Sequence, residues 1–138
     1  SLYNRAGFVT FAVYQDMTVR VPSDGFREPF EAASRVRPAT LADFGAIIDL
    51  ESDVSFIERP GDYRHFIENA DGNWHVSVCE DPRVPGQLEG VLVSCLHPAC
   101  NMIGPGAMRS GDAAVALGVC GGAGLADATG VCWGSVDT

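Results

Sequence analysis

The chain has 138 residues, 46% of them hydrophobic and 20% charged, a balance typical of one globular domain rather than of a disordered segment. Its formal net charge of −9 argues against binding to nucleic acids or anionic membranes, because both ligands are bound by clustered cations. All nine basic residues are Arg, and the lack of Lys excludes lysine Schiff-base chemistry and a Walker phosphate loop.

The first 22 residues combine a polar segment with an alternating one. Residues 2–8, "LYNRAGF", are typical of a helix end followed by a turn, and residues 14–22, "YQDMTVRVP", alternate as a strand that stops at a proline. Residues 23–34 are rich in Pro, Gly, Ser and charge without periodicity, so we interpret them as a linker. With no apolar run of roughly 18 residues and no signal-peptide pattern, we expect a cytoplasmic protein.

Two helices are predicted after a short strand at 35–38. Thr40 followed by Asp43 resembles a capping box, and the apolar residues behind it share one helical face up to about Glu51. The second helix is predicted from Pro60 to Ala70, because Pro suits a first helical position and apolar residues recur at helical spacing.

A β-hairpin is predicted next. Residues 74–80, "WHVSVCE", alternate between apolar and polar, and residues 88–96, "LEGVLVSCL", are apolar on both faces, which is typical of a central strand. The intervening "DPRVPGQ" supplies the turn.

The stretch "HPACNMIGPGAMRSGDAAVAL" carries the strongest functional signal. It predicts a strand at Cys100–Ile103, a glycine-rich loop at Gly104–Gly111 and a helix from Ala113 to Leu117. Backbone N–H groups where a loop enters a helix can hold an anion, although such loops are also glycine-rich for geometry alone. The glycines of "GVCGGAGLADATG" predict a short helix or one packed tightly on the sheet, and "VCWGSV" predicts a last strand.

The five cysteines form no CxxC pair and lie mostly within apolar runs. We interpret them as buried small hydrophobic residues in a reducing compartment, and we predict no metal site, because Cys and His are not closely spaced.

This order of elements resembles the GCN5-related N-acetyltransferase superfamily over about three quarters of the chain. "VRPATLADFGAIIDLE" is similar to its opening strand and first helix, and "WHVSVCEDPRVPGQLEGVLVSCL" to its second and third strands. "NMIGPGAMRSGDAAVAL" and "GVCWGSV" stand where its fourth strand, pyrophosphate loop, third helix and fifth strand belong. The resemblance implies an α/β fold with an α+β-like mixed sheet flanked by helices.

The resemblance also implies a division of the chain. Residues 1–22 are similar to the end of the family's last helix and its final strand, residues 23–34 link, and residues 35–138 form a domain without its own closing elements. Such an order fits a segment of a tandem two-domain acetyltransferase. We expect residues 1–22 to complete the sheet, with a partner chain as the alternative, because an open sheet edge promotes aggregation.

The resemblance implies acetyl-coenzyme A as cofactor, with its diphosphate on backbone amides at the start of the third helix. The residues expected there are Gly106, Ala107, Met108, Arg109, Ser110, Gly111, Asp112 and Ala113. In the family motif, a Gln or Arg precedes the glycines, whereas here Met108 occupies that position and Arg109 follows one residue late. Asp112 adds a negative charge, and Pro105 removes an N–H from the strand that normally holds the pantetheine arm.

Direct attack of an amine on the thioester needs a base and an acid for the leaving thiolate. Tyr3 matches the family's tyrosine acid, provided that residues 1–22 close this domain, and His97 or Glu89 are the candidate bases on the third strand. For His97 the alternative is a plain surface residue. Glu51 and Asp53 are interpreted as solvated charges, with attraction of a cationic substrate as the alternative.

Two functions follow from these expectations. The first is an acetyl-coenzyme A-dependent N-acyltransferase that acts on an amine-bearing small molecule or peptide. The second is a non-catalytic domain of the same fold that supports a partner domain or forms a homodimer, since the loop departs from the motif and closing elements are missing.

Overall fold

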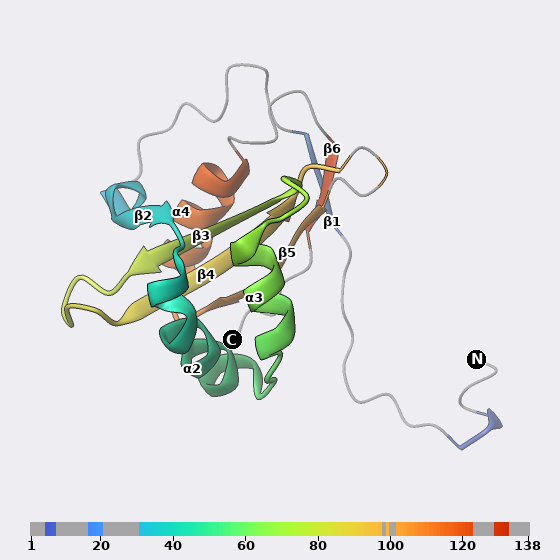
Figure 1. The fold of residues 1–138 in the computed structure, drawn as a ribbon, viewed down its shortest axis with the longest axis horizontal. Helices are drawn as coiled ribbons and strands as arrows, with labels where there is room; N and C mark the ends of the chain where they lie inside the picture. The colour runs from blue at the N-terminus through green and yellow to red at the C-terminus, as the bar shows by residue number, and fades with distance from the viewer. Residues whose placement is uncertain are drawn as a thin grey trace.

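The computed structural model describes residues 5–7, 17–20, 31–97, 99, 102–122 and 129–132 (Figure 1). The strands are β1 Met17–Arg20, β2 Val36–Pro38, β3 Trp74–Glu80, β4 Leu88–Cys95, β5 Met102–Met108 and β6 Thr129–Cys132. The helices are the 3₁₀ turns η1 Glu31–Arg35 and η2 Leu41–Asp43, with α2 Phe44–Ser55, α3 Pro60–Glu68 and α4 Gly111–Gly122.

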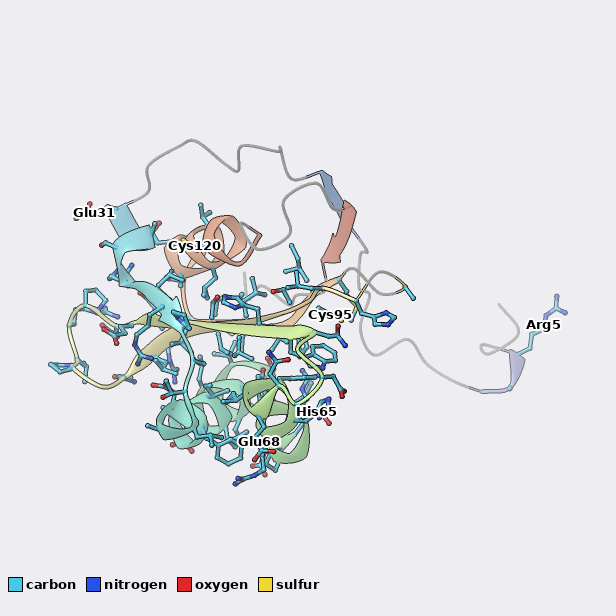
Figure 2. The ribbon with its side chains drawn as sticks, turned by 45° about the horizontal axis from the view of Figure 1, so that its top comes forward. Arg5, Glu31, His65, Glu68, Cys95 and Cys120 are labelled. Carbon is cyan, nitrogen blue, oxygen red and sulfur yellow. The ribbon has the colours of Figure 1, made fainter. Side chains whose placement is uncertain are left out.

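The strands form one six-stranded sheet in the order β1-β6-β5-β4-β3-β2. The pairs β2–β3, β3–β4 and β4–β5 are antiparallel, whereas β5 and β6 are parallel. Helices α2 and α3 cover one face of the sheet and α4 covers the other, as Figure 2 shows with the sheet seen nearly edge-on. The chain therefore has a three-layered α+β architecture, in agreement with the mixed class expected from the sequence.

The predicted hairpin is confirmed. β3 and β4 pair from Trp74↔Cys95 to Glu80↔Leu88, and every residue of β4 is buried, as a central strand requires. The side chains on the two faces of β4 belong to different hydrophobic cores, because successive side chains of a strand point to opposite sides of the sheet. The core under α2 and α3 contains Ile47, Leu50, Tyr63, Val76, Val78, Leu88, Val91, Val93 and Ala107. The core under α4 contains Cys79, Leu92, Ile103, Ala113 and Leu117.

Both predicted helical segments begin at the residues that the sequence indicates, after Thr40 and at Pro60. The backbone N–H of Thr40 donates to Asp43 Oδ2 at 2.8 Å, which is the back-bond of a capping box, and the helical segment then continues to Ser55. α3 begins at Pro60 as predicted and ends at Glu68, two residues earlier than predicted. It ends there because Asn69 turns left-handed, with φ of 46°, and its side chain bonds the backbone of Trp74.

The glycine-rich loop predicted at Gly104–Gly111 is wrong for its first half. Residues up to Met108 belong to β5, and Gly106 pairs with Leu92 of β4. A Cβ on Gly106 would lie 2.8 Å from Leu92 Cδ1 and 3.0 Å from the Val91 carbonyl oxygen. The glycine therefore serves close packing within the sheet, and it does not mark a loop.

Of the two alternatives predicted for the helix after this stretch, a short helix or one packed tightly on the sheet, the structure confirms the second. α4 begins at Gly111, before the expected Ala113, and runs for 12 residues through Gly118 to Gly122. The glycine penalty is outweighed by packing, since Ala113, Ala116 and Leu117 are fully buried against the sheet.

At the edge of the sheet, Met17–Arg20 pairs antiparallel with β6, from Met17↔Cys132 to Arg20↔Thr129. A part of the segment expected to complete the sheet thus lies beside its last described strand. Residues 1–4, 8–16, 21–30 and 133–138 lie outside the described residues, as do Cys100 and Asn101 of the predicted strand.

Candidate functional site

The start of α4 is built around Ser110. Its Oγ accepts a hydrogen bond from the Ala113 backbone N–H at 3.1 Å, and its carbonyl accepts from Ala114 at 3.1 Å, so Ser110 is the N-cap. The Gly111 and Asp112 amides have no backbone acceptor among the described residues, as is usual for the first amides of a helix. A Cβ on Gly111 would meet nothing within 4 Å, so the space over these amides is open on that side.

The eight residues expected to bind a cofactor do not all belong to this turn. Gly106, Ala107 and Met108 are in β5, where Ala107 is fully buried beneath α2 and α3. The prediction that these three residues form a loop at the helix start is therefore wrong. Arg109 and Ser110 make the connection, and Gly111, Asp112 and Ala113 form the first turn of α4.

Arg109 is the cation of this turn, and its side chain reaches α2. Its Nη2 lies 2.8 Å from Asp53 Oδ2, and its backbone N–H donates to the Glu89 carbonyl at 2.8 Å. Asp53 is exposed to solvent, as its interpretation as a solvated charge requires, and it also forms an ion pair with Arg109.

Glu89, a candidate base, also lies beside this turn. Burial opposes its ionisation, but hydrogen bonds from Arg35 and Ser110 outweigh that effect and hold the pKa of Glu89 below its usual value. A carboxylate with a lowered pKa is a poor proton acceptor at neutral pH. The geometry thus makes Glu89 a structural partner of Arg35 and of the α4 cap.

His97 lies at the other end of β4. Its side chain is exposed, and its Nδ1 accepts a hydrogen bond from the Ala99 backbone N–H at 3.1 Å. His97 follows Glu89 by eight positions, and the part of β4 from Glu89 to Cys95 alone spans about 20 Å. The structure therefore does not bring the two candidate bases together, and Tyr3, the candidate acid, lies outside the described residues.

The structure reveals a buried acidic group that the sequence interpretation placed in solvent. Glu51 is completely buried, and its Oε1 accepts hydrogen bonds from Arg59 Nε at 2.8 Å and Tyr63 Oη at 3.0 Å. The interpretation of Glu51 as a solvated charge is wrong. One signal was present in the sequence, since Glu51 follows Ile47 by four residues and so lies on the apolar face of its helix.

This cluster joins α2, α3 and the connection between them. Arg59 donates twice to the same carboxylate oxygen, and Glu51 Oε2 has no hydrogen-bond partner within the described part of the chain. Burial, together with the Glu51 charge, raises the pKa of Tyr63 well above its usual range, so the phenol stays protonated and remains a donor.

The first half of β5, at the end away from α4, has two irregular features. β5 pairs with β6 only at Met102↔Val131 and Ile103↔Cys132, within the residues described, although β5 continues to Met108. The register between β4 and β5 shifts between Leu92 and Ser94, opposite Gly104 and Pro105. Such bulges are over-represented beside active sites, where they change the direction of a strand.

The described cysteines agree with their interpretation as small hydrophobic residues. Cys79 and Cys95 are buried and Cys120 is half-buried, all three as free thiols, and burial raises the pKa of Cys79 and Cys120. Across the described ranges, no group of three or more His, Cys, Asp or Glu side chains could hold a metal ion. None of the helices that could be searched is long and apolar enough to cross a bilayer.

Two comparisons with known proteins gave no relative. No family model matches the chain. A search of curated proteins likewise found no match.

Proposed function

We propose that this chain is an acetyl-coenzyme A-dependent N-acyltransferase domain of the GCN5-related kind. The observation that carries the proposal is the pair of unpartnered amides of Gly111 and Asp112, at the start of a helix that directly follows a strand with a parallel neighbour. Ligands in sheets with parallel strands bind at the carboxyl ends of those strands, next to helix N-termini. The order of elements in the sequence supports the same assignment.

In this proposal, the cofactor's diphosphate lies over the first turn of α4. The Gly111 and Asp112 amides donate to it, Arg109 supplies a positive charge, and the missing side chain of Gly111 leaves room for it. The Glu89 and Asp112 carboxylates oppose an anion there. Arg35 offsets the first of them, because it forms a salt bridge with Glu89.

The bound cofactor would supply the thioester whose acetyl group is transferred. The acceptor's amine nitrogen forms a bond to the acetyl carbon, the carbon–sulfur bond breaks, and the amine loses a proton as the thiolate gains one. We assign the thiolate proton to Tyr3. The bulge at Gly104 and Pro105 places an irregular strand segment near the parallel pair, where backbone donors can turn toward the acyl oxygen.

A thermal unfolding experiment tests the proposal. Saturating acetyl-coenzyme A should raise the melting temperature, because a ligand at 100 times its Kd adds about 2.7 kcal/mol to the free energy of unfolding. Arg109→Gln should shrink the shift, whereas Arg64→Gln on the exposed face of α3 should leave it unchanged. No shift at millimolar cofactor in the unsubstituted protein would overturn the proposal.

A second candidate function is a non-catalytic domain that supports a partner. It is favoured by one observation, namely that the cation of the turn is already paired with Asp53 while the Glu89 carboxylate bonds the cap residue. This function predicts a concentration-dependent dimer in light scattering together with no response to acetyl-coenzyme A. A monomer that binds the cofactor would contradict it.

A further inference from the structure

Two described residues other than glycine hold a left-handed backbone, and they end the two helices on one face of the sheet. Asn69 ends α3 with φ of 46°, and Phe56 ends α2 with φ of 55°. Asn suits this position, and its side chain also bonds the Trp74 backbone. Phe does not suit it, because a left-handed backbone is costly for a bulky residue. The end of α2 therefore carries a residue that helix termination does not favour.

The Phe56 side chain adds nothing to the hydrophobic cores in return. It is 89% exposed, and the next residue, Ile57, is 42% exposed. Neither belongs to the core on either face of the sheet. An aromatic side chain buries about 150–250 Å² when it packs, and almost all of that area stays in water here. We call these two residues the Phe56 tip, which lies between the teal and green helices α2 and α3 (Figure 1).

The segment around the Phe56 tip is strongly acidic. Residues 49–62 contain five acidic side chains and a single Arg. That residue, Arg59, is bonded to the buried Glu51, and Arg109 from the β5–α4 connection offsets Asp53. The exposed carboxylates of the segment are those of Asp49, Asp53, Glu58 and Asp62. The apolar tip thus stands among negative charges that outnumber the cations beside them.

This charge decides which partner the Phe56 tip can accept. The last turn of α2 contains no basic residue, so the negative end of the helix dipole adds to the carboxylates. Such a surface repels an anionic membrane. It also repels a second copy of the chain, because a symmetric contact would bring the same carboxylates together. A basic protein segment is attracted instead, and its apolar residues can cover the ring.

We propose that the Phe56 tip is a docking site for a basic, amphipathic segment of a partner protein. Apolar side chains of that segment bury the Phe56 ring, and its Arg or Lys side chains meet the surrounding carboxylates. An exposed aromatic residue held at a conformational cost fits this role, because aromatic anchors carry much of the binding energy of an interface. The inference goes beyond the proposed function, since it assigns a partner and not a reaction.

Fluorescence anisotropy of a labelled peptide tests the docking. The probe is a synthetic amphipathic helix with Arg on one face and Leu on the other, titrated with the full chain. Phe56→Asn should bind this peptide at least about tenfold more weakly, as expected for the loss of an aromatic anchor. Val84→Asn is the matched control, because it removes a 47% exposed apolar side chain from the β3–β4 turn. Its affinity should stay within about twofold of the unsubstituted protein.

The charge requirement is tested separately. Glu58→Gln should weaken binding by up to about fivefold at low salt, and the difference should shrink at high salt, because exposed charges are screened. A peptide with Ser in place of Leu should no longer distinguish Phe56→Asn from the unsubstituted protein. A peptide with Glu in place of Arg should not bind, and binding as tight as that of the Arg peptide would contradict a basic partner.

A thermal scan checks that the ring does not serve the fold. Phe56→Asn should leave the melting temperature unchanged or raise it by about 2–4 °C, because Asn adopts the left-handed backbone more readily. A lower melting temperature would overturn the proposal, and so would equal peptide affinity in the two proteins or no binding of the Arg–Leu peptide. A dimer of the unsubstituted chain that Phe56→Asn dissociates would also overturn it, since the occupant would then be a second copy. The acetyl-coenzyme A shift should be the same in both proteins, so the proposed function is tested independently.

Discussion

The two faces of the sheet are closed in different ways. Beneath α2 and α3, large side chains and a buried ionic cluster fill the space, and the aromatic rings of Phe66 and Trp74 lie 4.4 Å apart. Beneath α4, the core has fewer buried residues and no aromatic ring, and Gly90 of β4 lets Leu117 approach the strand directly. One face is held by large side chains and buried charges, and on the other the side chains of α4 lie directly against the backbone of β4 at Gly90.

This difference bears on the proposed ligand site. On the face filled by large side chains, α2 and α3 end on backbone bonds, from the Phe56 amide to the Ser52 carbonyl and from the Asn69 amide to the His65 carbonyl. On the α4 face, Gly90 and Ala113 let the helix lie close to β4, and a Cβ on Gly111 in the first turn of α4 would meet nothing within 4 Å. The proposed site therefore belongs to the α4 face, although its cation reaches across to α2.

The largest effect is expected for the ionic cluster beneath α2 and α3. Glu51→Ala should lower the free energy of unfolding by about 3 kcal/mol, because it leaves a partly buried Arg59 and a buried Tyr63 hydroxyl without their acceptor. Urea unfolding measures this loss. Glu68→Ala removes a glutamate from an exposed pair with Arg64 and should cost no more than about 0.5 kcal/mol. Equal losses of unfolding free energy in the two variants would show that the buried cluster contributes no more to stability than an exposed ion pair does.

The close approach of α4 is tested at Gly90. A Cβ at this position would lie 2.6 Å from Leu117 Cδ1 and 3.3 Å from Ala113 Cβ, so Gly90→Ala should cost about 2 kcal/mol. Gly118→Ala is the matched control, because a Cβ there meets nothing within 4 Å. That substitution should stabilise the protein by about 0.5–1 kcal/mol through helix propensity. Stabilisation by both substitutions would contradict tight packing of α4 on β4.

A smaller, pH-dependent effect is expected at Asp43, where α2 begins. Hydrogen bonds from Arg37 and Thr40 hold the pKa of this carboxyl well below its usual value, against the opposing effect of burial. Since the folded pKa is lowered, the stabilisation is present above the unfolded pKa of about 4 and is lost as the pH falls.

Asp43→Asn should therefore cost about 1 kcal/mol at pH 7, discounted because Arg37 is 40% exposed. The difference from the unsubstituted protein should disappear between about pH 5 and pH 2, as followed by denaturant unfolding at each pH. A loss that is independent of pH would mean that the carboxylate charge is not what stabilises the helix start. Asp49→Asn, at an exposed position of α2, is the control, and at pH 7 it should cost no more than about 0.5 kcal/mol.

The sequence predicted those elements whose determinants are local. The hairpin followed from alternation and a turn, and the helix starts followed from Thr40 with Asp43 and from Pro60. These signals act over a few residues, so they are independent of what packs above them. The start of α4 was placed within two residues for the same reason.

The failures concern residues whose role is decided by distant partners. The sequence predicts Gly106 in a loop, but its pairing with Leu92 makes it part of strand β5. Glu51 was interpreted as a surface charge, whereas in the structure it is buried and accepts hydrogen bonds from Arg59 and Tyr63. Likewise, nothing near Glu89 in the sequence shows that Arg35 and Ser110 lower its pKa. In each case the partner is far along the chain or on another element.

The pairing of β1 with β6 has a consequence for the order in which the chain folds. These strands join residues near 20 to residues near 130, whereas β3 and β4 are joined by a short turn. Closing the longer loop costs about 2 kcal/mol more in chain entropy, so contact order favours the hairpin as an early event. Strand β1 should dock late, and the sheet from β2 to β5 should gain its protection against hydrogen exchange before that edge does.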